Sequence, residues 1–167
     1  MSRIHTLFLY LIGQCMAIGA IAQPAIGQWR DHFPYRQTRA VATGNGLFYC
    51  ASRNAVFSVD PGSGEIQRIS KINGLSDVDI TALSWNTALG ALLVGYSNGN
   101  LDVVHSDRTV NINDIKRSSI IGDKRINTMM NDGGLVYLGC GFGVVVVDLG
   151  REEVRDTWVA HLNQLGG

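Results

Sequence analysis

Short runs of apolar residues, separated by clusters of Gly, Asn and Asp, extend from about residue 38 to residue 159. Several runs alternate between apolar and polar positions, as half-buried β-strands do. The separating clusters, such as GNG at 44–46 and DGG at 132–134, favour tight turns between antiparallel strands. This part of the sequence contains no amphipathic helical stretch of ten residues or more. The pattern therefore predicts an all-β fold.

The same pattern returns every 44 residues, because YCASRNAVFSVD (49–60), LVGYSNGNLDVV (93–104) and YLGCGFGVVVVD (137–148) align without gaps. A short strand-like run precedes each copy and another follows it, so each unit contains four predicted strands. Four strands in a repeat of about 40–45 residues are typical of a β-propeller blade. We predict a β-propeller with three four-stranded blades.

The repeat also predicts how the chain is divided. The segments are a signal peptide (1–22), an entry segment (23–37), blade 1 and its linker (38–79), blade 2 and its linker (80–125), blade 3 (126–159) and a tail (160–167). Propellers close their ring with four to eight blades. We therefore expect a fragment of a larger ring, either from a longer protein or from a truncated product, and a ring of two or more copies is the alternative.

The first 22 residues predict a cleaved export signal. Arg3 precedes the apolar run LFLYLIGQCMAIGAIA, and small residues at Ala20 and Ala22 favour cleavage between Ala22 and Gln23. A signal anchor is the competing interpretation, but the run is short for a membrane span. We expect an exported protein with no membrane span after the signal is removed.

GCGFGVVVVD at 139–148 raises the question of a dinucleotide-binding loop, which requires a strand, a glycine turn and then a helix. The four valines that follow the glycines favour a strand instead. We predict a β-hairpin in which Gly141 and Gly143 adopt positive φ.

Composition and motifs give little support to catalysis or to nucleic-acid binding. Acidic and basic residues balance at 14 each, without a basic stripe. His32, His105 and His161 lack metal-ligand spacing. We expect a non-enzymatic protein with no cofactor, no metal site and no nucleic-acid partner.

Two other residue types carry structural expectations. Cys50 and Cys140 lie in blades separated by a whole blade, so a disulfide is ruled out by distance and we expect two free, buried thiols. We expect the tryptophans to be wedges between blades rather than sugar platforms; they are Trp29, Trp85 and Trp158.

The linker after blade 2 supplies the candidate contacts. Four cations within ten residues could bind an anionic saccharide or a phosphate, and a solvated loop is the alternative; they are Lys116, Arg117, Lys124 and Arg125. Tyr96 and Asn98, at the turn of blade 2, are further candidates for a ligand or partner contact.

Three stretches of the sequence resemble a known family. IGQWRDHFPYRQTRAVA (26–42), LFYCASRNAVFSVD (47–60) and ISKINGLSDVDITALSWN (69–86) resemble the N-terminal β-propeller of the PorZ family, components of the type IX secretion system of Bacteroidetes. INDIKRSSIIGDKRIN (112–127) also resembles this family. The resemblance implies a non-enzymatic protein of the periplasm or the outer-membrane cell surface. It implies a PorU-like secretion protein and anionic lipopolysaccharide as partners.

NGLSDVDITAL (73–83) also resembles the linker repeated in the periplasmic propellers of two-component hybrid sensors. The alternative function is therefore a ligand-sensing propeller of a hybrid histidine kinase.

Overall fold

A computed structural model of the protein describes residues 37–159. The predicted signal peptide and its cleavage site after Ala22 lie outside the described residues, as do Trp29, His32, His161 and the tail.

Within residues 37–159, twelve strands form three antiparallel sheets of four strands, each in sequence order. Blade 1 contains β1 (Ala40–Gly44), β2 (Leu47–Ala51), β3 (Ala55–Val59) and β4 (Ile66–Ser70). Blade 2 contains β5 (Ile80–Asn86), β6 (Ala91–Tyr96), β7 (Leu101–Val104) and β8 (Thr109–Ile112). Blade 3 contains β9 (Ile126–Asp132), β10 (Leu135–Cys140), β11 (Gly143–Asp148) and β12 (Glu153–Val159). One helical turn, α2 (Asp114–Arg117), lies between blades 2 and 3 in the sequence. The predicted fold class, three four-stranded propeller blades, is confirmed.

The turns follow the chemistry that the sequence predicts, with one exception. Asn45 and Gly46 have φ of 51° and 75° and form the two-residue turn between β1 and β2, as a type I′ hairpin requires. The hairpin predicted at 139–148 is confirmed, because β10 pairs antiparallel with β11.

The expectation of positive φ at both hairpin glycines is right for Gly143, at 153°, and wrong for Gly141, which does not have positive φ. A Cβ at Gly141 would lie 2.7 Å from the backbone oxygen of Asp123. Close packing of the linker, and not backbone conformation, therefore requires glycine at that position.

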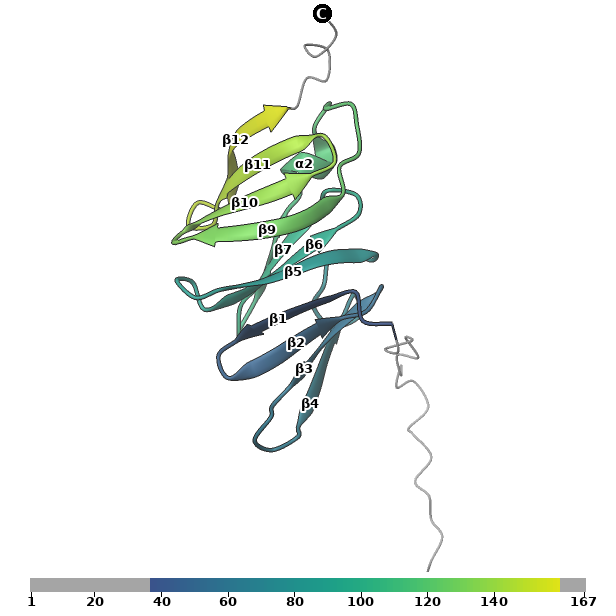
Figure 1. Cartoon of the computed structure of the whole chain (residues 1–167), viewed down its shortest axis with the longest axis vertical. Helices are drawn as coiled ribbons and strands as arrows, with labels where there is room; N and C mark the ends of the chain where they lie inside the picture. Colours follow the sequence, from purple (N-terminus) through teal and green to yellow (C-terminus); the bar gives the residue numbers. More distant parts are fainter. Residues whose placement is uncertain (1–36, 160–167) are drawn as a thin grey trace, which may run out of the picture. The chain divides into compact units, whose positions relative to one another are not determined.

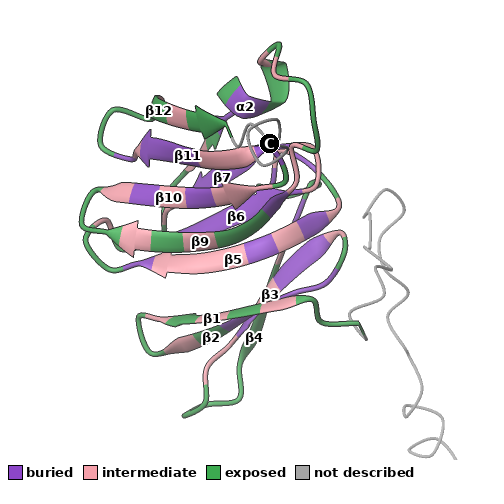
Figure 2. Ribbon diagram, turned by 45° about the horizontal axis from the view of Figure 1, so that its top comes forward, coloured by how far each residue is buried: buried purple, intermediate pink, exposed green. Residues whose placement is uncertain are grey.

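The first strands of the blades, β1, β5 and β9, lie next to one another (Figure 1). β6, in the central blade, is buried along its whole length (Figure 2). Successive side chains of a strand point to opposite faces. Leu92 and Val94 therefore join the core shared with blade 1, and Leu93 joins the core shared with blade 3. Each interface between blades is one hydrophobic core.

The tryptophan and cysteine expectations are met in part. Trp85 stacks on Tyr49 across the first interface, with ring centroids 5.4 Å apart, and so is a wedge as expected. Trp158 is 54% exposed and does not fill an interface between the described blades. Cys50 and Cys140 are free but only half-buried. The burial expectation fails for Cys50 because its side of β2 faces away from blade 2.

Candidate functional site

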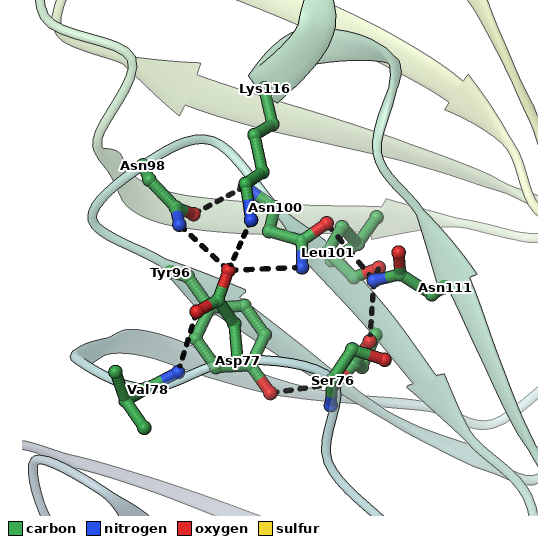
Figure 3. A network of polar contacts seen from close by, with 10 residues as sticks. Ser76, Asp77, Val78, Tyr96, Asn98, Asn100, Leu101, Asn111 and Lys116 are labelled. Carbon is green, nitrogen blue, oxygen red and sulfur yellow. Dashed lines mark hydrogen bonds and ion pairs between the residues drawn. The ribbon is translucent and has the colours of Figure 1, made fainter. Parts of the chain in front are cut away.

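The linkers between blades and the turns between second and third strands meet at the same end of the sheets. The linker at 71–79, the turn at 97–100 and helix α2 are joined there by side-chain hydrogen bonds. Figure 3 shows several of these groups converging on Asp77. A second aspartate, Asp102, binds Tyr96 and the backbone of Ser76. We call the residues bonded to these two carboxylates the junction network.

Asp77 is the centre of one half of the network. Its Oδ2 atom accepts hydrogen bonds from Nζ of Lys116 at 2.6 Å and from Nδ2 of Asn98 at 2.7 Å, and Oδ1 accepts from the backbone N–H of Val78 at 3.0 Å (Figure 3). Burial acts to raise the pKa of Asp77, but the hydrogen bonds and the positive charge of Lys116 outweigh it and lower the pKa to about 2. Asp77 is therefore an anion that fixes the linker to α2.

Asp102 is the centre of the other half and is completely buried. Its Oδ2 atom accepts from the Tyr96 hydroxyl at 2.6 Å and from the backbone N–H of Ser76 at 2.8 Å. Its Oδ1 atom accepts from Nδ2 of Asn111 at 2.8 Å. Burial, followed by the charge of Asp102, raises the pKa of Tyr96, so the phenol stays a donor. Asp102 thereby ties β6, β8 and the linker to one point of β7.

Asp79 fixes the linker to blade 1. Oδ1 of Asp79 is 2.8 Å from Nη1 of Arg39 and 3.1 Å from Nε of Arg53. Its backbone oxygen accepts from the N–H of Ser97. Asp79 has φ of 63°, a left-handed conformation that aspartate tolerates better than most residues. The three aspartates of this region are thus committed to holding the blade junction.

The structure brings the four predicted cations to this end of the sheets but gives them different roles. Lys116 is paired with Asp77, and Nζ of Lys124 donates to the backbone oxygens of Lys116 at 3.1 Å and Ser118 at 2.7 Å. Lys124 therefore caps the C-terminal end of α2. Within residues 37–159, the side chains of Arg117 and Arg125 have no hydrogen-bond or ion-pair partner, and Arg117 is exposed. These two cations remain for an external anion.

The two turn residues predicted as contacts are part of the junction network. Tyr96 is fully buried, so a ligand does not reach its side chain in this conformation. Asn98 is half-buried, and its amide is bound to Asp77. Both positions hold the linker in place instead of presenting polar groups to solvent.

The loop that follows α2 presents an apolar tip. Ile121 is 95% exposed, whereas Ile120 packs against the core between blades 2 and 3. A Cβ at Gly122 would lie 3.2 Å from Phe142, which shows how closely the loop lies on the β10–β11 turn. Ile121 is therefore a solvent-exposed side chain on a loop that is held on both sides. We call Ile121 and Arg117, which lies four positions earlier in the chain, the exposed tip.

Sequence reasoning found the cations but missed Ile121 and Asp102. An apolar residue in a loop gives no sign of whether it faces the core or the solvent, as the pair Ile120 and Ile121 illustrates. Asp102 carries a weak signal, because a lone carboxylate in the apolar run LDVV requires a partner if the strand is buried.

A metal site and a membrane-spanning helix each have structural requirements, which apply to the part of the chain that the structure describes. Residues 37–159 contain no group of three or more His, Cys, Asp or Glu side chains placed to hold a metal ion. In the same residues, no helix has the length and apolar character that crossing a membrane demands.

The pair of Asp77 and Lys116 predicts a specific loss of stability in acid. The folded pKa of Asp77 is about 2 against an ordinary value of 3.8. The pair's stabilisation is therefore complete above about pH 4 and is lost as the pH falls toward 2, because the unfolded state binds the proton first. We expect the free energy of unfolding to fall by up to about 2 kcal/mol more in the wild type than in Asp77→Asn over this interval. Urea unfolding at pH 5 and pH 2.5 measures the difference.

Lys116→Met is the matched variant, since it removes the partner but keeps the Asp77 carboxylate. Its acid loss should lie between those of the wild type and Asp77→Asn. Equal pH dependence in all three proteins would show that the pair does not couple folding to protonation.

The comparisons with known proteins agree with the propeller fold. Residues 48–165 match the family described as the TSS9, PorZ, N-terminal β-propeller domain. No curated protein sequence matches the chain.

Among solved structures, the chain is similar to PorZ, an essential bacterial surface component of the type IX secretion system of Porphyromonas gingivalis, with a TM-score of 0.68 and 24% identity over 72% of the chain. It is also similar to the extracellular domain of the putative hybrid two-component system BT4673 from B. thetaiotaomicron, with a TM-score of 0.65 and 16% identity over 80% of the chain. The chain covers 16% and 18% of these two structures. At these identities the structural likeness shows the fold alone.

Proposed function

The chain belongs to the family of PorZ N-terminal β-propeller domains of the type IX secretion system, and from this premise we propose that it is a non-enzymatic interaction module of that secretion apparatus. The proposal places the chain outside the cytoplasm, in the periplasm or at the outer-membrane cell surface. The predicted export signal and the extracellular setting named for both structural relatives support this location.

The exposed tip is the observation that carries the interaction role. A side chain of isoleucine that is 95% exposed contributes nothing to the core of its own chain. Lys124, through its hydrogen bonds to α2, and Phe142, through its contact with the loop, hold this segment in one conformation. A pre-ordered loop loses little entropy on binding, so its apolar tip and Arg117 form an efficient contact for a protein.

A PorU-like secretion protein is the protein partner that we propose for this tip, following the family resemblance. Anionic lipopolysaccharide is the second proposed partner, through the cations that have no partner among residues 37–159, Arg117 and Arg125. Two free cations supply less attraction than the four that the sequence offers, because Lys116 and Lys124 are committed inside the chain. The tip therefore favours the protein partner over the polyanion.

The test measures binding of the full chain to a purified PorU-like protein by surface plasmon resonance. We expect Ile121→Ser combined with Arg117→Glu to weaken binding about tenfold or more, as the loss of an interface anchor does. Ile66→Ser is the matched control, because Ile66 is also exposed, at 54%, but lies on blade 1. Unchanged affinity in the tip variant, or an equal loss in the control, would contradict the role of the tip.

A ligand-sensing propeller of a hybrid histidine kinase is the second candidate function. The similarity to the extracellular domain of BT4673, which is a putative hybrid two-component system, supports it. In that case a small ligand should stabilise the chain, and the exposed tip should have no part in binding a secretion protein. The same tip variant thus distinguishes the two functions.

A further inference from the structure

The interface between blades 1 and 2 contains a cavity with several polar lining residues. Several of the equivalent positions in the interface between blades 2 and 3 are apolar. The volume of the cavity is about 290 Å³, and it opens to solvent between β4 and the loop after β7. Tyr49, Ser58 and Gln67 are cross-strand neighbours on blade 1 and line one side of the cavity. Trp85, Leu92 and Val104 line it from blade 2. We call it the inter-blade cavity.

The second interface serves as an internal comparison, because it is built from the same repeat. Ser58 pairs with Gln67 across β3 and β4, and the structurally equivalent pair in blade 2 is Val103 with Val110. Both valines pack in the hydrophobic core between blades 2 and 3. The inter-blade cavity thus has a hydroxyl and an amide where the next interface has two apolar side chains.

The loop after β7 at the cavity is also more polar than the equivalent loop after β11. The residue after β7 is His105, which lines the cavity, and the residue after β11 is Leu149, which is buried in the core between blades 2 and 3. An interface that needed only to be stable would use the apolar choice at both places, since filling a cavity restores lost contacts. The polar choice therefore indicates a use other than packing.

Ser58 is the residue that points most directly to a ligand. Its side chain is 7% exposed, it lines the cavity, and its hydroxyl has no hydrogen-bond partner among residues 37–159. No buried side-chain oxygen or nitrogen of residues 37–159 lacks a partner, so the Ser58 hydroxyl is accessible to the water of the cavity. A ligand hydroxyl that replaces this water supplies the same hydrogen bond.

The chemistry of the wall selects the class of ligand. No Asp, Glu, Lys or Arg of the described chain lines the cavity, so a net charge would find no counter-charge there. Asn45, Ser58 and Gln67 carry neutral groups that can donate and accept, as the hydroxyls of a sugar do. Nε2 of Gln67 donates to Oε1 of Glu65 at 3.2 Å, which leaves its amide oxygen for a ligand hydroxyl. Tyr49 and Trp85 stack on each other, so only the part of their rings outside this stack is left to contact the C–H groups of a sugar.

We propose that the inter-blade cavity binds a neutral saccharide, with one ring in contact with Ser58 and Gln67 of blade 1 and with the part of blade 2 that lines the cavity. A volume of about 290 Å³ is at the lower end for ligand pockets and suits one monosaccharide unit. A second hollow of about 480 Å³ shares Ile69, Val104, His105 and Ser106 with the cavity, so a longer chain continues outward into it. This site is separate from the exposed tip and does not depend on the proposed secretion partner.

The test uses the full chain and a panel of D-glucose, D-galactose, D-mannose and D-glucuronate, with binding followed by saturation-transfer NMR and by tryptophan fluorescence. We expect at least one neutral sugar to bind saturably and glucuronate to bind at least tenfold more weakly. Ser58→Val with Gln67→Val, which reproduces the blade 2 pair, should abolish sugar binding while leaving the unfolding midpoint in urea unchanged or higher. Arg155→Gln, an exposed position of blade 3, is the control and should bind as the wild type does.

The single variant Ser58→Ala guards against a misfolded double variant, because it removes the hydroxyl without adding volume. We expect it to weaken the binding of the neutral sugar about tenfold, as loss of one buried hydrogen bond does. Three outcomes would each overturn the proposal: no neutral sugar binds, glucuronate binds as well as glucose, or the valine pair binds sugar like the wild type. The exposed tip is unchanged in these variants, so their failure says nothing against the secretion role.

Discussion

Replacing Asp102 by leucine should lower the free energy of unfolding by about 3–5 kcal/mol. Three donors bind the Asp102 carboxylate, namely the Tyr96 hydroxyl, the Asn111 amide and the backbone N–H of Ser76. Leucine removes this acceptor from the Tyr96 hydroxyl and the Ser76 N–H, and each donor that stays buried costs about 1–3 kcal/mol. The Asn111 amide keeps Oδ1 of Asn100 as an acceptor at 2.9 Å. Asn111 is exposed and regains water, which is why we place the sum below the maximum. Urea unfolding followed by circular dichroism measures the loss.

Two further variants keep this prediction testable if Asp102→Leu does not fold. Tyr96→Phe removes one donor and should cost about 1 kcal/mol, the net value of one hydrogen bond. Asp102→Asn keeps one acceptor oxygen and should fall between Tyr96→Phe and Asp102→Leu. Asp107→Leu, in the exposed loop after β7, is the control and should stay within about 0.5 kcal/mol of the wild type. A loss below 1 kcal/mol for Asp102→Leu would show that the network does not hold the blades together.

The repeat and its hairpins are visible in the sequence because they depend on local chemistry. Asn45-Gly46 dictates a type I′ turn wherever it stands between two strand-forming runs, and four valines favour a strand after any turn. Strand order within each blade follows from the short turns, which leave no room for another connection. These features need no information from distant parts of the chain.

The sequence could place the candidate site, but it could not predict which charged groups form ion pairs and hydrogen bonds with one another. Lys116 is a free cation by sequence, yet its charge is used by Asp77, which lies 39 positions earlier in the chain. Lys124 is taken by the backbone of a helical turn too short to give a periodic signal. Pairings of this kind depend on how two blades dock, and docking depends on side chains at every position of the interface. Whether a charged side chain is paired within the chain or free to bind a partner can therefore be decided only from the packed blades.

The inter-blade cavity likewise needed the structure, because its contrast with the next interface depends on strand register. The gapless 44-residue alignment places Ser58 over Asp102 and Gln67 over Asn111, which are also polar. Only the strand register of the structure makes Val103 and Val110 the equivalents of Ser58 and Gln67, so this contrast is not visible in the sequence alone. A repeat supplies its own control, because equivalent positions face equivalent surroundings. A polar departure at a position that is apolar in the next unit thus marks a place where packing is not the whole purpose.

Replacing Gly95 by valine should lower the free energy of unfolding by about 3 kcal/mol, because the change overfills the interface between blades 2 and 3. A Cβ at Gly95 would lie 2.5 Å from Cε of Met129 and 2.9 Å from Cγ2 of Ile126, both on β9. The backbone of Gly95 does not have positive φ, and valine favours strands. Any loss therefore comes from the collision between the blades. Urea unfolding measures it, and Gly134→Val, where an added Cβ meets nothing within 4 Å, is the control.

A double-mutant cycle isolates the contact responsible. Gly95→Ala alone should cost about 1 kcal/mol, since the flexible end of Met129 can move aside. Met129→Ala removes the atom that the new Cβ meets, so the double variant should be more stable than the sum of the single losses by about 1 kcal/mol. Additive losses would mean that Gly95 is required for another reason. Coupling would show that the first strand of blade 3 takes the space that a larger residue at Gly95 would fill.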